Sequence, residues 1–285
     1  TLLGDPALRL ALPSTKLKTK INSIVNLTQN EATDTLKSLM KVRVTGELID
    51  PSGVKLSDFS GYIFTKLFDK KIPYTTLLND GGNMPFSYTF RHNLLFEGKN
   101  SVKNGAFSID FVVPKDIAYQ IDFGKMSFYA VSSNRLECNG YQSVLIGGSE
   151  MNAYNDNEGP ELKLYMNDSS FIFGNATDNS PLILVMLKDS SGINITSENI
   201  AHSMEAILDE KSTQSIKLSP YFEPKLDSYQ EGKIKYRLSD VSVGRHSVEV
   251  KAYDTYNNPN RAYTEFIVAG DAKIALAHVL NYPNP

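Results

Sequence analysis

The chain has 285 residues, which exceeds the usual size of one hydrophobic core and leads us to expect two domains. It carries 29 basic and 32 acidic residues, for a formal net charge of -3, and this balance gives no electrostatic footprint for nucleic acid or an anionic lipid surface. Its single cysteine excludes an internal disulfide. The 15 tyrosines, 14 phenylalanines and 18 glycines favour strands and turns over helices.

The chain begins on an apolar stretch, TLLGDPALRLALP (residues 1–13), which is interrupted by the turn signal Gly4-Asp5-Pro6. The pattern indicates a short buried strand, a turn and an extended exit. It lacks the charged and long apolar segments of a secretory signal, and no apolar run in the chain reaches the ~18–20 residues that a membrane-spanning helix needs. We therefore expect residues 1–13 to end an upstream domain, and the turn-rich residues 273–285 to start a following module.

Alternation of apolar and polar residues predicts a first β-sandwich domain over residues 14–146. Met40, Val42 and Val44 share one face of a strand while Lys41 and Arg43 take the other, which is typical of a half-buried strand. The polar stretch 28–39 is expected to be a strand-linker or one short helix. Further strands are predicted at 61–69, on both sides of a turn at 100–105, at 106–113 and at 125–133.

An acidic, Asn-rich run at 147–160 predicts a linker, because few contacts cross such a segment. The strand pattern restarts after it and predicts a second β-sandwich domain over 161–272. Within it, the apolar run 181–189 indicates a strand buried on both faces. The sequence therefore predicts an all-β fold of two tandem immunoglobulin-like β-sandwich domains, with a leftover N-terminal strand.

Three segments resemble a known family. LLGDPALRL resembles the closing strand of the peptidase domain in gingipain-type cysteine peptidases, in which a caspase-like α/β domain precedes an immunoglobulin-like module. NDNEGPELKLYMND, GRHSVEVKAYDTYNNPNRA and VLNYPNP are similar to the post-catalytic region of the sortases of the type IX (Por) secretion system of Bacteroidetes. The resemblance covers the first dozen residues and most of 146–285.

The resemblance implies a non-catalytic region of a cell-surface cysteine peptidase, on the extracellular side of the outer membrane. Members of that family cleave the sorting domain from secreted cargo and attach the cargo to lipopolysaccharide. This region would act as a spacer or docking scaffold, with the upstream peptidase domain and outer-membrane secretion proteins or cargo sorting domains as partners. The family's catalytic His and Cys lie upstream of the GDPALRL-like strand, so no catalytic residue is carried over and the fragment is not expected to be an enzyme.

A cysteine nucleophile is the enzymatic alternative, because the chain holds one cysteine and four histidines (92, 202, 246 and 278). Cys138 is followed by Asn139-Gly140, which suits a turn rather than the helix N-terminus that lowers a thiol pKa. His202 and His246 are expected at the beginnings of strands, as rim residues. No HxH or HExxH spacing supports zinc. We therefore expect Cys138 to be a structural thiol.

Calcium is the metal that the sequence favours. The segment NAYNDNEGPE offers Asp156, Glu158 and Glu161, which are hard oxygen donors of the kind that Ca²⁺ takes. The spacing does not match an EF-hand, and a solvated acidic linker has the same composition, so both interpretations stay open. Asp254, in AYDTYNNPN, is expected to cap a β-turn rather than bind an ion. No other cofactor is predicted.

Aromatic residues give an alternative function, a free-standing extracellular module that binds carbohydrate or peptide. Tyr221, Phe222 and Tyr229 lie in SPYFEPKLDSYQEG, a long connection between strands, and such loops are disproportionately functional. They are the predicted partner-binding residues. A stacking platform is a further option, formed by Tyr62, Tyr74, Tyr88 and Tyr119.

Overall fold

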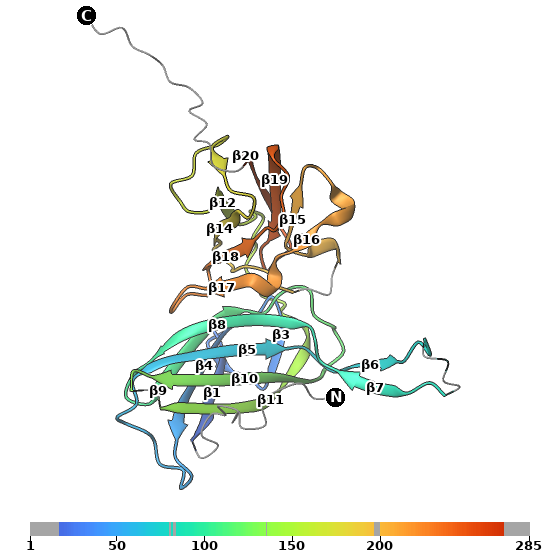
Figure 1. Ribbon diagram of the computed structural model, residues 1–285. Coiled ribbons are helices and arrows are strands. Elements are labelled where there is room, and N and C mark those ends of the chain that lie inside the picture. The colour runs from blue at the N-terminus through green and yellow to red at the C-terminus, as the bar shows by residue number, and fades with distance from the viewer. Residues whose placement is uncertain (1–16, 80, 82–83, 135, 197–199, 271–285) are drawn as a thin grey trace, which may run out of the picture.

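The computed structural model describes residues 17–79, 81, 84–134, 136–196 and 200–270 (Figure 1). Across these residues the protein is all-β, with strands β1–β20 and three short 3-10 helices, as the sequence predicted. Its buried apolar residues form two clusters, one between residues 36 and 146, around strands β1–β11, and one between residues 166 and 268, around strands β12–β20. We call these parts the N-terminal half and the C-terminal half. The expected strand in 1–13 and the expected module at 273–285 lie outside the described residues.

The N-terminal half is one nine-stranded sheet in which the strands follow the order β8-β5-β10-β11-β1-β4-β9, with β2 beside β1 and β3 beside β11. The path curves, so that β8 and β9 at its two ends approach each other (Figure 1). The strands are β1 (Lys18–Asn26), β2 (Glu31–Ala32), β3 (Thr35–Ser38), β4 (Lys41–Ile49), β5 (Gly61–Phe68), β8 (Leu94–Val102), β9 (Ala106–Val112), β10 (Asp122–Ser132) and β11 (Glu137–Ser149).

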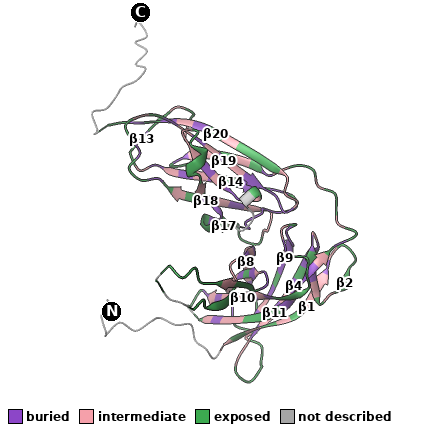
Figure 2. Ribbon diagram, turned by 90° about the vertical axis from the view of Figure 1, so that its right-hand side faces the viewer, coloured by how far each residue is buried: buried purple, intermediate pink, exposed green. Residues whose placement is uncertain are grey.

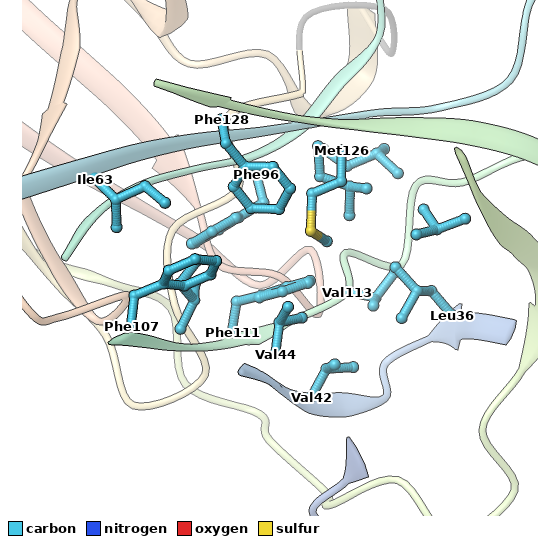
Figure 3. Packing of buried hydrophobic residues seen from close by; sticks show 14 of the residues in the cluster. Leu36, Val42, Val44, Ile63, Phe96, Phe107, Phe111, Val113, Met126 and Phe128 are labelled. Atoms are coloured by element: carbon cyan, nitrogen blue, oxygen red, sulfur yellow. The ribbon is translucent and has the colours of Figure 1, made fainter. Parts of the chain in front are cut away.

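Alternate side chains along these strands point into the core. Val42 and Val44 are fully buried in β4, while the lysine and arginine between them face solvent, as the alternation predicted. Figure 3 shows the cluster around Phe96 and Phe111, whose ring centroids lie 4.4 Å apart. Asn104-Gly105 joins β8 to β9, and both residues have positive φ, which a two-residue hairpin turn of this kind requires.

A separate two-stranded ribbon, β6 (Ile72–Thr75) and β7 (Ser87–Phe90), projects from the N-terminal half (Figure 1). Ile72 pairs with Phe90 and Tyr74 with Tyr88, so these four side chains share one face of the ribbon. Phe90 is 54% exposed and Tyr88 46%. No residue of the ribbon belongs to either core cluster. We call this element the arm.

The C-terminal half is a sandwich of two sheets. The four-stranded sheet has the order β12-β14-β18-β17 and the five-stranded sheet the order β13-β20-β19-β15-β16. The strands are β12 (Glu161–Met166), β13 (Ala176–Thr177), β14 (Leu182–Lys188), β15 (Glu205–Leu208), β16 (Ile216–Lys217), β17 (Phe222–Pro224), β18 (Glu231–Arg237), β19 (Gly244–Tyr253) and β20 (Pro259–Val268). The 3-10 helices are η1 (Ile200–His202), η2 (Ser212–Gln214) and η3 (Ser219–Tyr221).

Both sheets of the C-terminal half contribute to one core. Val185 and Ile234 of the first sheet and Val250 and Phe266 of the second are fully buried in the same cluster, and Figure 2 shows buried segments gathered inside each half. β14 is buried on one face only, since Met186 is 43% exposed. The prediction that both faces are buried was wrong, because the outer-face side chains Leu182 and Leu184 are only half-buried and Met186 is exposed.

Two connections differ from the sequence-based expectation. The stretch 28–39 holds the short strands β2 and β3, and β3 pairs in parallel with β11, so the strand interpretation is confirmed and the short helix is wrong. β11 continues through Gly147 and Gly148 to Ser149. The irregular connection to the C-terminal half therefore begins at Glu150 rather than at residue 147.

Candidate functional site

The two halves meet at a polar junction, where Asp116 of the N-terminal half is held by side chains of the C-terminal half. Asn257 Nδ2 donates to its Oδ1 at 2.9 Å, and Asn194 Nδ2 donates to its Oδ2 at 3.3 Å. His202 Nδ1 lies 2.9 Å from the same Oδ2. Because the carboxylate receives donors from three separate segments, it ties those segments to the N-terminal half.

A second aspartate makes the reciprocal contact. Asp227, between β17 and β18, accepts the Ser101 backbone N–H on Oδ1 at 2.6 Å and the Ser101 Oγ on Oδ2 at 2.7 Å. Its own N–H donates to the Lys99 carbonyl at 2.8 Å, and Lys115 N–H donates to the Thr255 carbonyl at 2.8 Å. Each half thus supplies one carboxylate that the other half binds. We call Asp116 and Asp227 the junction aspartates.

Three further carboxylates converge within the C-terminal half. Asp156 lies in the connection before β12, Asp189 directly follows β14 and Asp254 directly follows β19, and one carboxylate oxygen of each lies within 4.8 Å of the others. Asp254 is 0% exposed and Asp189 8%. Among the described residues, none of the three forms an ion pair with lysine, arginine or histidine. We call them the three-carboxylate cluster.

Burial shapes the electrostatics of this cluster. Burial and, to a smaller extent, the charges of Asp189 and Asp156 raise the pKa of Asp254 to about 6, although hydrogen bonds from Asn258 oppose the change. Burial also raises the pKa of Asp189. Three neighbouring carboxylates cannot all stay charged without cost, so such a group either keeps a proton or binds a cation. Its oxygen donors match those that Ca²⁺ takes.

The residues predicted to bind metal lie apart from one another. Asp156 belongs to the cluster, whereas Glu158 is exposed and donates its backbone N–H to Asp156 Oδ1 at 3.2 Å. Glu161 is exposed and pairs with Lys163 at 3.0 Å. Asp254 caps its turn as expected, accepting the Tyr256 N–H on Oδ1 at 2.9 Å, and it also joins the cluster. Its position directly after a buried strand was the available sequence signal.

The three predicted partner-binding aromatics also lie apart. Phe222 is 9% exposed and packs in the C-terminal core. Tyr229 packs against the N-terminal core, with Lys41 Nζ 5.9 Å from its ring centroid. Tyr221 is 46% exposed, with its ring edge-on to a neighbouring tyrosine. The arrangement forms no single stacking surface from these three residues.

The cysteine and the buried histidine have structural surroundings. Cys138 is 0% exposed, and burial raises the pKa of its thiol to about 12, which is the opposite of what a thiolate nucleophile needs. His246 is 8% exposed, with Nδ1 at 2.8 Å from Asp209 Oδ2 and Nε2 at 2.7 Å from the Ser242 carbonyl. Neither residue is arranged for catalysis.

The strands and their order define an all-β region that contains a β-sandwich. Over 94% of its length the chain is similar to the crystal structure of dimeric latent PorU from Porphyromonas gingivalis, with 27% sequence identity and a TM-score of 0.52. The chain spans 25% of that PorU chain, so it corresponds to about a quarter of the longer protein.

Two other solved structures match more weakly. They are the fibronectin(III)-like modules of CbhA from Clostridium thermocellum (14% identity, 88% of this chain, 93% of that chain, TM-score 0.24) and red sea bream transglutaminase (8% identity, 89% of this chain, 31% of that chain, TM-score 0.26). No family model and no curated protein sequence matches the chain. Within the described residues, no helix has the length and apolar character to cross a membrane.

Proposed function

We propose that the chain is the non-catalytic β-sandwich region of a cell-surface cysteine peptidase related to gingipains and PorU, and that it serves as a spacer or docking scaffold. The similarity to PorU over 94% of the chain at 27% identity carries the proposal, because it extends through both halves. A spacer of this kind holds the upstream peptidase domain at a fixed separation from the outer membrane.

The junction supports this role physically. A spacer must resist bending between its parts, and interfaces between domains of one chain are often mobile by default. Here Asp116 and Asp227 make charge-assisted hydrogen bonds in both directions across the junction. Bonds of this kind are about twice as strong as neutral ones. The two halves are therefore suited to act as one stiff unit.

The proposed partners are the upstream peptidase domain and either outer-membrane proteins of a type IX secretion system or the sorting domains of cargo. The proposed location is the cell surface, on the extracellular side of the outer membrane. Nucleic acid and direct membrane insertion form no part of the proposal. The alternative, a free-standing module for carbohydrate or peptide, is favoured by a cavity at the junction.

Calcium stays the proposed cofactor, with a different set of donors. Of the residues predicted from the sequence, Asp156 is retained, while Asp189 and Asp254 replace Glu158 and Glu161 because their carboxylates converge on it. A bound cation would offset the repulsion between the three carboxylates and would fix the connection before β12 to the ends of β14 and β19. That would add to the stiffness of the region.

The coding sequence upstream of Thr1 tests the proposed function directly. A caspase-like α/β pattern that carries a histidine and a cysteine at strand ends is the expected finding. A signal peptide encoded immediately before Thr1 would overturn the proposal and leave the free-standing binding module. In a second test, the full-length protein carrying both Asp116→Ala and Asp227→Ala should process its cargo more slowly than the unaltered protein, with the peptidase domain itself unchanged.

A further inference from the structure

A cavity of about 860 Å³ opens at the junction, beside Asp116. Both halves line it: Asn93 and residues 115–119 come from one, and Thr196, His202 and residues 256–258 come from the other. Small-molecule sites have volumes of ~300–1,000 Å³ and occur preferentially between domains. We infer that this cavity binds a neutral, hydroxyl-rich ligand of the saccharide class. The inference does not depend on the proposed spacer role, and it gives the carbohydrate alternative a specific site.

The charges of the lining indicate that the ligand is neutral. Asp69 and Lys70 form an ion pair in which Oδ1 and Nζ lie 2.8 Å apart, and their side chains are 6% and 8% exposed. Asp116 Oδ1 already accepts a hydrogen bond from Asn257 Nδ2 at 2.9 Å. The lining therefore holds two carboxylates, Asp69 and Asp116, and two ammonium groups, Lys70 and Lys115. Because these charges offset one another, a charged ligand would leave an unneutralised charge in the cavity.

Two polar groups in the lining retain hydrogen-bonding capacity. Asn93 is 8% exposed, and its Oδ1 is buried without a partner among the described residues. The Lys70 ammonium has three N–H donors, of which Asp69 and the Ile146 carbonyl, at 3.1 Å, take two.

An unpartnered buried amide oxygen is unfavourable, because it has lost its hydrogen bonds to water without replacing them. The Cβ–Cγ torsion of asparagine is soft, and in the proposed complex a rotation about it brings this oxygen to the ligand. A ligand hydroxyl both donates and accepts, and it could therefore bind the Asn93 oxygen and accept the remaining Lys70 N–H.

Aromatic and apolar surface completes the site. Tyr119, from the N-terminal half of the chain, lines the cavity and is 57% exposed. Tyr256, from the C-terminal half, lines it as well. Ile72, at the base of the arm, is 37% exposed. A pyranose ring carries hydroxyls around its edge and C–H groups on its faces, so it needs both hydrogen-bonding groups and flat apolar surface. Tyr119 was among the residues that the sequence suggested for a stacking platform.

The test uses the whole chain and defined probes. Saturation-transfer NMR and calorimetry are run with the methyl glycosides of mannose, galactose, glucose and N-acetylglucosamine, and with methyl glucuronide and glucosamine as charged comparators. At least one neutral glycoside should bind with a Kd near or below about 1 mM, as small ligands with a few hydrogen bonds do. The charged comparators should bind at least about tenfold more weakly.

Two variants locate the binding. Asn93→Leu keeps the branching and number of side-chain heavy atoms and removes the unpartnered buried amide oxygen, so the melting temperature should hold while affinity for the glycoside falls about tenfold or more. Tyr119→Ala should weaken binding to a similar extent. Tyr141→Ala is the matched control, because Tyr141 is 72% exposed and lies outside the cavity lining.

Three outcomes would overturn the inference. The first is that no neutral glycoside gives a saturable signal up to about 20 mM, a concentration far above the expected Kd. The second is that both Asn93→Leu and Tyr119→Ala bind as the unaltered chain does. The third is that a charged comparator binds more tightly than every neutral glycoside.

Discussion

The junction aspartate Asp116 and the three-carboxylate cluster both involve aspartates in loops at the ends of strands, yet their surroundings are opposite. Asp116 receives amide donors from Asn194 and Asn257. Asp254 has other carboxylates within 4.8 Å. The first carboxylate is surrounded by hydrogen-bond donors, whereas the second is surrounded by other carboxylates, whose repulsion a proton or a cation offsets. The neighbours of an aspartate, rather than its residue type, therefore decide what it contributes.

Removing the well-paired carboxylate should have the largest effect. Asp116→Ala removes the acceptor that Asn257 Nδ2 uses at 2.9 Å, whereas the buried Asn194 amide keeps its bond to Asn257 Oδ1 at 2.9 Å, so we expect a loss of about 2–3 kcal/mol in the free energy of unfolding. Urea denaturation measures it. Asp110→Ala is the control, because its ion pair with Arg43 is largely solvent-exposed and such pairs contribute less than about 1 kcal/mol. Equal losses in the two variants would contradict the special role of Asp116.

The cluster should make stability depend on pH. The pKa of Asp254 lies near 6, against 3.8 for an ordinary aspartate, so the folded state binds this proton more tightly than the unfolded chain does. The stabilisation is complete below pH 3.8 and is lost as the pH rises through 6, by up to about 3 kcal/mol.

Denaturation with a chelator present, at pH 4 and at pH 7.5, checks this prediction. The quantity compared is the difference in free energy of unfolding between the unaltered chain and Asp254→Asn, because carboxylates outside the cluster titrate equally in both proteins. At pH 7.5 the unaltered chain should be less stable, relative to Asp254→Asn, than it is at pH 4. A difference that does not change with pH would mean that Asp254 is not held protonated.

A smaller gain in stability is expected for Asp189→Asn. Asp189 Oδ1 accepts the N–H groups of Ser191 at 2.7 Å and Gly192 at 3.1 Å, and asparagine can keep these bonds. The new amide would replace a repelling charge beside Asp254, so metal-free stability at pH 7.5 should rise by about 1 kcal/mol. Millimolar Ca²⁺ should raise the melting temperature of the unaltered chain and leave that of the variant unchanged.

Two controls separate the cluster from its surroundings. Asp168 makes a similar turn contact, accepting the Ser170 N–H at 2.8 Å, but it is exposed, and Asp168→Asn should not gain stability. Glu158→Gln and Glu161→Gln should retain the calcium response, because neither carboxylate joins the cluster. Loss of the response in either glutamine variant would restore the donor set predicted from the sequence.

The smallest effect is expected at the arm. Thr75 pairs with Ser87, so an Asn-Gly turn can replace residues 76–86 and close the ribbon early. No arm residue belongs to a core cluster, and the free energy of unfolding should change by less than about 0.5 kcal/mol. Thermal denaturation measures it. A larger loss would show that the arm stabilises the N-terminal half.

Much of the fold could be predicted because strand patterns are local. The alternation at Val42 and Val44 predicts which face of β4 is buried, and this follows from the two-residue period of a strand. β1 was missed because its exposure pattern alternates between exposed and half-buried residues and contains little apolar contrast. The arm was missed because its aromatic face looks like that of a core strand in the sequence.

The sequence by itself determined the all-β class and the positions of most strands, and it placed a turn within residues 100–105, although β8 continues to Val102. Only the tertiary structure decided which chain segments meet. Asp156, Asp189 and Asp254 converge because two strand ends and a connection lie at the same end of one sandwich, and the junction cavity exists because two halves face each other. A local pattern fixes the direction of a side chain, whereas its neighbours depend on how distant strands pair.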